Sequence, residues 1–227
     1  MSIDIATAIK LLPVVIKDPA DTVRGMSFYK ALGGKPISDE LVAYIKTSED
    51  GQRMLKERVD IFQIFTNREK LRSLPKNTLG NQYITWADEE GIYPEGLAEI
   101  ADSLGLYDAE GGDPDLELLG RRQQVLHDMY HLLTGYNRDT GGEMALLTFS
   151  SIQEKNTAMR IIAWLGQVMF LVRFRFDLFK LRKEAKERAI KSPLLITQKW
   201  EELMERPINE VREKLGLNPM PVYKELW

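Results

Sequence analysis

The chain has 227 residues, of which 44% are hydrophobic and 29% are charged, and its formal net charge is -3. This composition is enough to bury a substantial core, and we expect one domain spanning residues 1–227. The sequence contains no cysteine, which excludes disulfide scaffolds, thiolate metal centres and cysteine nucleophiles. A metal ion would therefore need nitrogen or oxygen ligands.

The N-terminal segment MSIDIATAIKLLPVVIKDPA has no Arg, carries two acidic residues, and its apolar run is broken by Pro13. These features are not typical of a signal or transit peptide. The longest uncharged apolar run, residues 161–172, is far shorter than the ~20 residues needed to span a bilayer. We therefore expect a cytoplasmic protein that is either free or peripherally attached to a membrane surface.

Stretches rich in glycine and proline divide the rest of the chain into segments with helical periodicity. The segment RVDIFQIF, residues 58–65, could pass for a strand, but the spacing of its apolar residues suits a helix better. We predict an all-α fold, a single compact domain of about eight helices packed by ridges into grooves.

The charges are unevenly distributed along the chain. No Lys or Arg occurs between Asn77 and Gly120, where eleven acidic residues lie. Such a surface would repel phosphate backbones, so nucleic acid is not an expected partner. Between Arg173 and Lys191 the balance reverses, with eight Lys or Arg, which predicts a basic helix; ordinary solvated helix faces would give the same pattern.

One helix is predicted in detail, over residues 114–134. Asp113 suits its N-cap, and Gly135 stands where a C-terminal cap is needed. Both histidines of the chain, His127 and His131, lie on this helix. A spacing of four residues puts them one turn apart on one edge of the helix, so both rings can reach one point.

A second helix is predicted to begin near Glu143. The intervening turn, YNRDTGG, is short, so the first turn of the second helix should return toward the last turns of the first. Glu143 can then face the two histidines. Asp128 lies further round the same edge of the first helix, closer to His131 than to His127.

These residues predict a metal site with nitrogen and oxygen donors. Its expected ligands are His127, Asp128, His131 and Glu143. Two imidazoles with carboxylates suit zinc, with iron and manganese as alternatives and magnesium less favoured because it prefers oxygen ligands. The alternative without a metal places the histidines at the edge of the core, with Glu143 completing a capping box with Thr140.

Two enzyme classes with similar motifs fit less well. Zincin peptidases use H-E-x-x-H with the glutamate as base, whereas this chain has the shorter Asp128 at that position. Phosphohydrolases with a His-Asp doublet need a further histidine, and the chain has two in all. Nucleotide-binding loops and a G-x-S-x-G motif are also absent from the sequence. No catalytic residue is therefore assigned. A hydrolase is the least favoured function.

The full spacing H-D-x-x-H-x11-E resembles the signature of the ubiquinone (coenzyme Q) biosynthesis protein 4 family. The upstream segment LPKNTLGNQYITWADEEGIYPE and the downstream segment WEELMERPINEVREKLGLNPMP resemble that family as well. The resemblance covers most of the chain from about residue 70 and is weaker before it.

This resemblance implies a mostly helical, zinc-containing protein of quinone biosynthesis, peripherally bound to a membrane and associated with other enzymes of the pathway. Two functions stay open: oxidative decarboxylation of a polyprenylated aromatic precursor, or a non-catalytic lipid-binding scaffold with a structural metal. Eukaryotic members belong to the mitochondrial inner membrane, whereas the start of this sequence predicts no mitochondrial leader. A role in another quinone or prenyl-lipid pathway is therefore a further option.

A polyprenylated ligand needs an apolar channel, and flexible methionines suit a variable tail. The expected lining lies on an apolar helix predicted over residues 156–189 and consists of Met159, Ile162, Leu165, Met169 and Phe170. An ordinary core helix would carry the same residues. Three arginines flank this run and could bind an anionic headgroup or pair with acids of the protein: Arg160, Arg173 and Arg175.

The segment RFRFDLFKLRK, which follows the apolar run, alternates cations and aromatic residues. This pattern is typical of a helix lying at a membrane surface, with bases at the headgroups and rings below them. A helix that binds a partner or forms a homodimer would explain it equally well.

Overall fold

Helices form the regular structure of the described residues, which are 3–17, 21–35, 37–93, 96, 99–100, 103, 113–174 and 177–225 of this computed structural model. The first half contains α1 (Ile5–Lys17), α2 (Thr22–Ala31), α3 (Asp39–Thr47), α4 (Glu49–Glu57), α5 (Ile61–Thr66), α6 (Arg68–Ser73) and α7 (Leu79–Glu90). The second half contains α9 (Pro114–Thr134), α10 (Thr140–Gln153), α11 (Thr157–Phe174), α12 (Asp177–Lys191), η1 (Leu195–Thr197), α13 (Trp200–Leu203) and α14 (Ile208–Lys214). The predicted all-α fold is confirmed.

The expected number of about eight helices was wrong, because polar caps divide the first half of the chain into short helices. Asp60 and Asn67 each accept a backbone N–H bond at the start of a six-residue helix. The segment 58–65 is accordingly not a strand. It is broken at Arg58, whose φ of 49° ends α4, and becomes helical again at Ile61.

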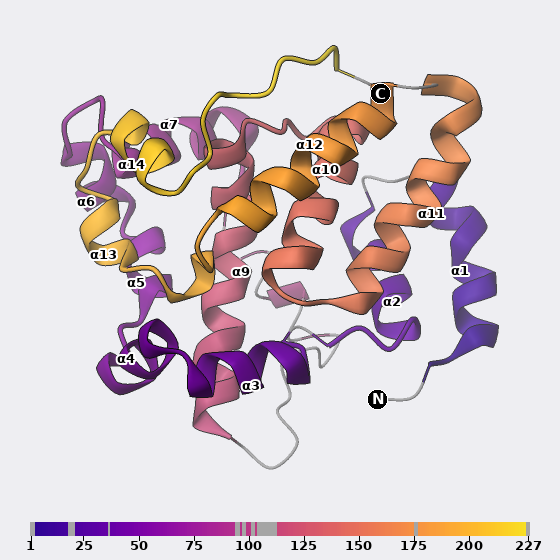
Figure 1. Ribbon diagram of the computed structural model, residues 1–227, viewed down its shortest axis with the longest axis horizontal. Coiled ribbons are helices and arrows are strands. Elements are labelled where there is room, and N and C mark those ends of the chain that lie inside the picture. The colour runs from indigo at the N-terminus through magenta and orange to yellow at the C-terminus, as the bar shows by residue number, and fades with distance from the viewer. Residues whose placement is uncertain are drawn as a thin grey trace.

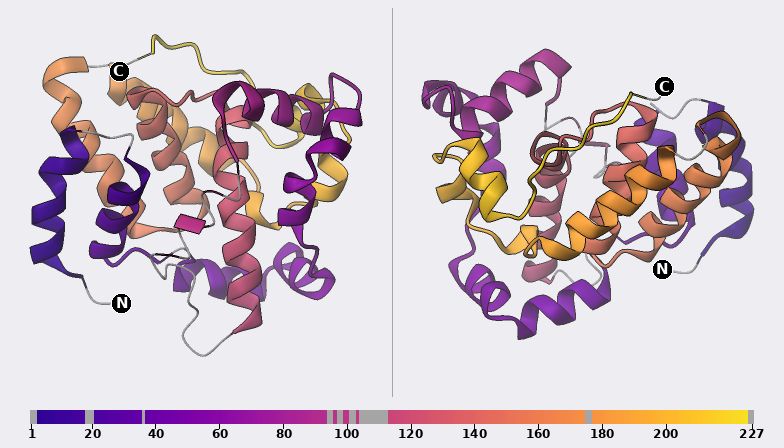
Figure 2. Two further views of the ribbon diagram at one scale, coloured as in Figure 1. Left: turned by 180° about the vertical axis from the view of Figure 1, so that it is seen from behind. Right: turned by 45° about the horizontal axis from the view of Figure 1, so that its top comes forward.

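The helix α9 runs through the middle of the molecule (Figure 1). The short helices α4 to α7 lie to one side of it, and α10 to α12 lie to the other, as the reversed view also shows (Figure 2). Most buried apolar side chains form one cluster around α9, in which Leu126, Met129 and Leu133 have no exposed surface. The central position of α9 leaves His131 buried and His127 partly buried.

The buried Arg122 connects α9 to distant parts of the chain. Its guanidinium donates to the carbonyls of Ile196 at 3.0 Å, Val59 at 3.2 Å and Gln198 at 2.8 Å. Burial lowers the pKa of Arg122 to about 10, still above neutral pH, so the group remains charged. This contact fixes η1 and the α4–α5 connection against the N-terminal half of α9.

A second, smaller cluster joins the N-terminal helices to α11. It consists of Ala8, Phe28 and Ala31, with Ile162 and Leu165 packed against it. No helix among the described residues has the length and apolar character needed to cross a bilayer.

Candidate metal centre

The C-terminal end of α9 is hydrogen-bonded to neighbouring helices. The predicted helix 114–134 is confirmed at both ends: Asp113 accepts a bond from the N–H of Asp115, and Gly135, with a φ of 72°, forms the C-cap. The carbonyls of the last turn find donors on other helices. Arg212 of α14 donates to Leu132 O and Arg188 of α12 donates to Thr134 O, both at 2.8 Å.

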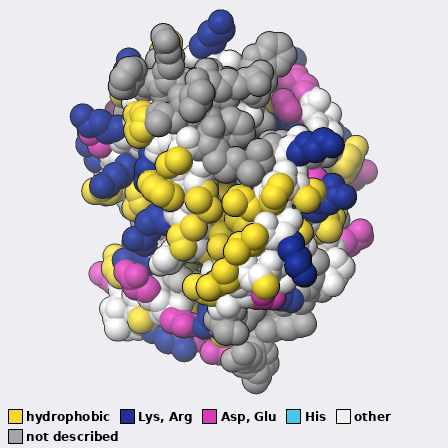
Figure 3. Space-filling view, turned by 90° about the vertical axis from the view of Figure 1, so that its right-hand side faces the viewer, with side chains coloured by type: hydrophobic (Ala, Val, Ile, Leu, Met, Phe, Trp, Pro, Cys, Tyr) yellow, Lys and Arg dark blue, Asp and Glu magenta, His cyan; other side chains and the backbone are white. Residues whose placement is uncertain are grey.

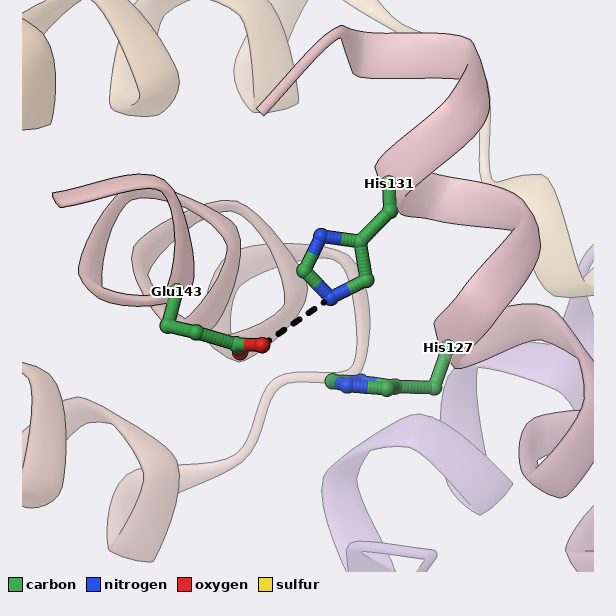
Figure 4. Close-up of side chains that lie close together, drawn as sticks. All are labelled: His127, His131 and Glu143. Atoms are coloured by element: carbon green, nitrogen blue, oxygen red, sulfur yellow. Dashed lines mark ion pairs between the residues drawn. The ribbon is translucent and has the colours of Figure 1, made fainter. Parts of the chain in front are cut away.

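The start of α10 is set by Asp139, whose side chain accepts bonds from Gly141 N and Gly142 N at 3.0 and 3.3 Å. The capping box between Thr140 and Glu143 was therefore wrong as an alternative, because Thr140 is already the first helical residue. The carboxylate of Glu143 points toward α9 instead (Figure 4).

His127, His131 and Glu143 come together as predicted from their spacing. One donor atom from each lies within 4.8 Å of the other two, and the Nε2 of His131 is 3.4 Å from Oε1 of Glu143. The two imidazole rings are perpendicular, with centroids 5.3 Å apart. Figure 4 shows the three side chains converging from α9 and α10.

Asp128, the fourth predicted ligand, does not belong to this group of three donor atoms. Its side chain is only partly exposed, and burial raises the pKa of its carboxyl. The structure thus assembles three of the four predicted donors.

The orientation of His131 is fixed by the backbone. Its Nδ1 lies 2.8 Å from the carbonyl oxygen of Tyr136, and because a carbonyl can only accept, Nδ1 must carry the hydrogen. The Nε2 of a neutral ring would then present a lone pair to the Glu143 carboxylate. Two acceptors at this distance require either a shared proton or a metal ion between them.

The pKa shifts of the three side chains are consistent with a proton or a metal ion between His131 and Glu143. Burial alone would lower the pKa of His131. The bond to Glu143, the charges of Glu143 and Asp128 and the contact with the Tyr136 carbonyl together outweigh burial, so the pKa is raised. Burial alone would raise the pKa of Glu143. The bond to His131 and the electrostatic interactions with His131, His127 and Arg138 together outweigh burial, so the pKa is lowered. Burial and the neighbouring His131 lower the pKa of His127, which keeps this imidazole neutral at pH 7, as metal binding needs.

The three donors fit a zinc ion, and equally iron or manganese, in their chemical type. Three protein ligands are the usual number in catalytic zinc sites, in which the remaining position is open to water or substrate. The carbonyl of Tyr136 supplies the support that metal-binding histidines normally have on their second ring nitrogen. Sequence spacing could not have identified it, because a backbone carbonyl leaves no residue signature.

The structure describes only some of the predicted lipid-binding residues of α11, so their common lining stays a prediction. Ile162 and Leu165 are partly buried against α1 and α2, and Met159 is partly buried near the start of α11, whereas Arg160 is exposed. The side chains of Met169, Phe170 and Arg173, and the whole of Arg175, lie outside the described residues.

A small pocket lies between α10, α11 and α12. Its lining consists of Gly141, Met144, Ala145, Thr148, Ala163, Gln167, Leu178, Leu181 and Arg182. At one side of it Arg182 donates to the amide oxygen of Gln167. The sequence prediction missed this pocket because it placed the lining on one helix, whereas Met144 follows Glu143 directly on α10.

Comparisons with known proteins agree with the fold and with the family resemblance. The family model described as Coenzyme Q (ubiquinone) biosynthesis protein Coq4 matches residues 26–221. The mitochondrial ubiquinone biosynthesis protein COQ4 of Paracoccidioides brasiliensis is 32% identical over 188 residues, 78% of this chain and 59% of that protein. The mitochondrial coq-4 protein of Neurospora crassa is 30% identical over 214 residues, 91% of this chain and 58% of that protein.

A crystal structure from Nostoc punctiforme, of a protein assigned provisionally to ubiquinone biosynthesis, has the same fold. Its TM-score is 0.68 at 22% identity, covering 95% of this chain and 97% of that one. The chain spans less than two thirds of the length of the curated fungal relatives. The match over residues 26–221 is nevertheless most of the sequence, and the chain therefore belongs to the Coq4 family of ubiquinone biosynthesis proteins.

Proposed function

We propose that this protein binds a polyprenylated aromatic carboxylate at a zinc site and catalyses its oxidative decarboxylation in ubiquinone or related prenyl-quinone biosynthesis. The observation that carries the proposal is the convergence of His127, His131 and Glu143 on one point. Membership of the Coq4 family is the reason for proposing ubiquinone biosynthesis as the pathway.

In this proposal His127, His131 and Glu143 hold the metal, with iron, manganese or magnesium as alternatives to zinc. A bound zinc ion would act as a Lewis acid that stabilises negative charge on the substrate as carbon dioxide leaves. The Tyr136 carbonyl keeps the hydrogen of His131 on Nδ1 and so keeps Nε2 directed into the site. Because Asp128 stands outside the group of three, a metal held by three protein ligands would keep a position for an oxygen of the substrate.

The proposed reaction replaces the ring carboxyl group by a hydroxyl group. The bond between the ring and the carboxyl carbon breaks, carbon dioxide leaves, and the ring loses two electrons overall. Dioxygen is the proposed electron acceptor, so that the acid, dioxygen and water give a phenol, carbon dioxide and hydrogen peroxide.

The polyprenyl tail needs an apolar surface near the metal ligands. The pocket between α10, α11 and α12 supports this role because two residues of its lining, Gly141 and Met144, stand on either side of Glu143 in the sequence of α10. The α11 residues Met159, Ile162, Leu165, Met169 and Phe170 remain proposed contacts of the tail. Headgroup binding by Arg160, Arg173 and Arg175 likewise remains a proposal.

A non-catalytic scaffold is the second candidate, and one surface favours it. Exposed apolar side chains lie on α1 and α11, where Ile5 and Ile9 are each 66% exposed and Trp164 is 52% exposed. Figure 3 shows apolar side chains gathered on this side of the molecule, with Lys and Arg around them. Such a surface suits attachment to anionic membrane headgroups, and we propose a peripheral membrane location, where other quinone biosynthesis proteins or a second copy could dock.

A carboxyl-labelled prenylated hydroxybenzoic acid separates the two functions. Zinc content and labelled carbon dioxide are measured for the wild type, for Glu143→Gln, and for the control Glu117→Gln, which changes an exposed carboxylate on α9. Catalysis at the metal predicts zinc and turnover in the wild type and control, and loss of both in Glu143→Gln. Turnover without zinc would contradict the metal role, and bound lipid without turnover would favour the scaffold.

A further inference from the structure

The residues that follow α14 cross over the connection between the two helices of the metal centre. We call residues 218–225 the C-terminal strap; it runs from α14 toward the start of α10 (Figures 1 and 2). At its beginning, Arg188 of α12 donates to both Thr134 O and Leu217 O. One guanidinium therefore joins the end of α9 to the start of the strap.

The strap lies directly on the C-cap of α9. A Cβ added to Gly135 would be 2.3 Å from Cε of Met220 and 3.2 Å from Cδ of Pro221. The ring of Tyr223 lies 6.4 Å from that of Tyr136, at an interplanar angle of 55°. This packing places the hydroxyl of Tyr223 over the loop between α9 and α10.

The Tyr223 hydroxyl bonds to both sides of that loop. It accepts the backbone N–H of Asn137 at 2.8 Å and donates to Oδ2 of Asp139 at 2.9 Å. The other oxygen of Asp139 caps α10, the helix that carries Glu143. The N–H of Asn137 belongs to the peptide unit whose carbonyl is that of Tyr136, the acceptor for His131.

The surroundings of Gly142 leave little space for the loop or the first turn of α10 to move. A Cβ on Gly142 would lie 1.9 Å from the carbonyl oxygen of Asn137 and 2.7 Å from the hydroxyl of Tyr223. The loop, the first turn of α10 and the hydroxyl group thus meet at one crowded point, one residue before Glu143.

We infer that Tyr223 is a positioning residue of the metal centre, whose hydroxyl aligns the Tyr136 carbonyl with His131 and the first turn of α10 with α9. The inference rests on the proposed function, because it assumes that His127, His131 and Glu143 bind a metal. The family model matches residues up to 221 and does not include Tyr223. Its positioning role is therefore inferred from its own contacts.

The test uses cobalt(II), whose visible absorption depends on the geometry of its ligands and which accepts the same donor types as zinc. Tyr223→Phe removes only the hydroxyl group, and Tyr44→Phe is the matched control on the partly exposed Tyr44 of α3. We expect Tyr223→Phe to bind cobalt about 10-fold more weakly, the scale of effect found for residues that support metal ligands, with an altered absorption spectrum. The control should match the wild type.

Wild-type affinity and spectrum in a folded Tyr223→Phe protein would overturn the inference while leaving the proposed function intact. If Tyr223→Phe does not fold, Asp139→Asn replaces the acceptor of the same hydrogen bond and keeps an oxygen for the cap of α10. An unchanged cobalt spectrum in that variant overturns the inference, and a weakened site supports it. A wild-type protein that binds neither cobalt nor zinc would instead reject the proposed function and, with it, the role of Tyr223.

Discussion

The Nδ1–H of His131 donates to the backbone carbonyl of Tyr136, five residues further along the chain, at 2.8 Å. This contact decides that Nε2 is the ring nitrogen that faces Glu143. The loop between α9 and α10 therefore does more than reverse the chain, since it also sets which atom of His131 is available to a metal.

Gly142→Ala should weaken both the metal centre and the fold around it. Its methyl group would overlap the Asn137 carbonyl, so the loop and the first turn of α10 must separate. We expect the free energy of unfolding to fall by about 1–3 kcal/mol, as overpacking usually costs, and zinc affinity to fall about 10-fold. Urea unfolding and zinc titration measure the two effects.

Gly25→Ala is the matched control, because a Cβ on Gly25 within α2 meets nothing within 4 Å. It should leave zinc binding unchanged and stabilise the helix by up to about 1 kcal/mol. Equal zinc affinity in Gly142→Ala and the wild type would contradict the crowding described at this loop.

Arg188→Lys should weaken the junction between α9 and the strap. The guanidinium of Arg188 is buried and reaches both Thr134 O and Leu217 O, a geometry that a single ammonium group cannot reproduce. We expect a loss of about 1–3 kcal/mol in thermal or urea unfolding. Arg121→Lys on the exposed face of α9 should change stability by less than about 0.5 kcal/mol, and equal losses in both variants would reject the role of Arg188.

Glu154 should make stability depend on pH. Burial raises the pKa of this carboxyl to about 8, despite a bond from Gln123. The amide oxygen of Gln123 has no partner among the described residues, and a protonated Glu154 could donate to it. Because the folded pKa lies above the ordinary 4.5, the stabilisation is full below pH 4.5 and is lost as pH rises through 8.

Urea unfolding across this range should show the free energy contributed by Glu154 falling by roughly 3–5 kcal/mol with rising pH, as the pKa difference requires. Glu154→Gln stays neutral and should remove most of this dependence. Glu89→Gln, at an exposed position of α7, should retain it. A Glu154→Gln protein with the wild-type pH profile would show that Glu154 is not the group responsible.

Trp164→Ser should reduce binding to membranes if the apolar side of α1 and α11 is the attachment surface. Flotation with anionic liposomes, at low and high salt, measures the bound fraction. We expect a several-fold decrease relative to Val222→Ser, which alters a 97% exposed apolar residue elsewhere. Absence of wild-type binding at both salt concentrations would contradict the proposed membrane location.

Features of the metal centre that depend on residues close together in the sequence could be predicted. Helix caps and the spacing of His127 and His131 depend on neighbouring residues, and a short connection limits where Glu143 can lie. Asp128 shares the helix edge with the histidines, but small rotations around the helix axis decide whether a carboxylate reaches their common point. Sequence spacing does not resolve rotations of that size.

Features that depend on tertiary packing were not predictable. The strap reaches the loop from 86 residues away, through the bond between Tyr223 and Asn137, and no periodic pattern marks such a contact. Ile162 and Leu165 were expected to line a lipid channel, and the sequence did not reveal that both also pack against α1 and α2. A helix that is apolar on several sides does not reveal which side meets which neighbour.

X-ray absorption at the zinc edge of the reconstituted protein tests the central claim most directly, since it reports the atoms bound to the metal. The geometry of His127, His131 and Glu143 predicts one zinc per chain with two imidazole ligands at about 2.0–2.1 Å and oxygen in the remaining positions. In Glu143→Gln the zinc content should fall sharply. A spectrum without imidazole scattering, or full zinc loading after both histidines are replaced, would contradict the site.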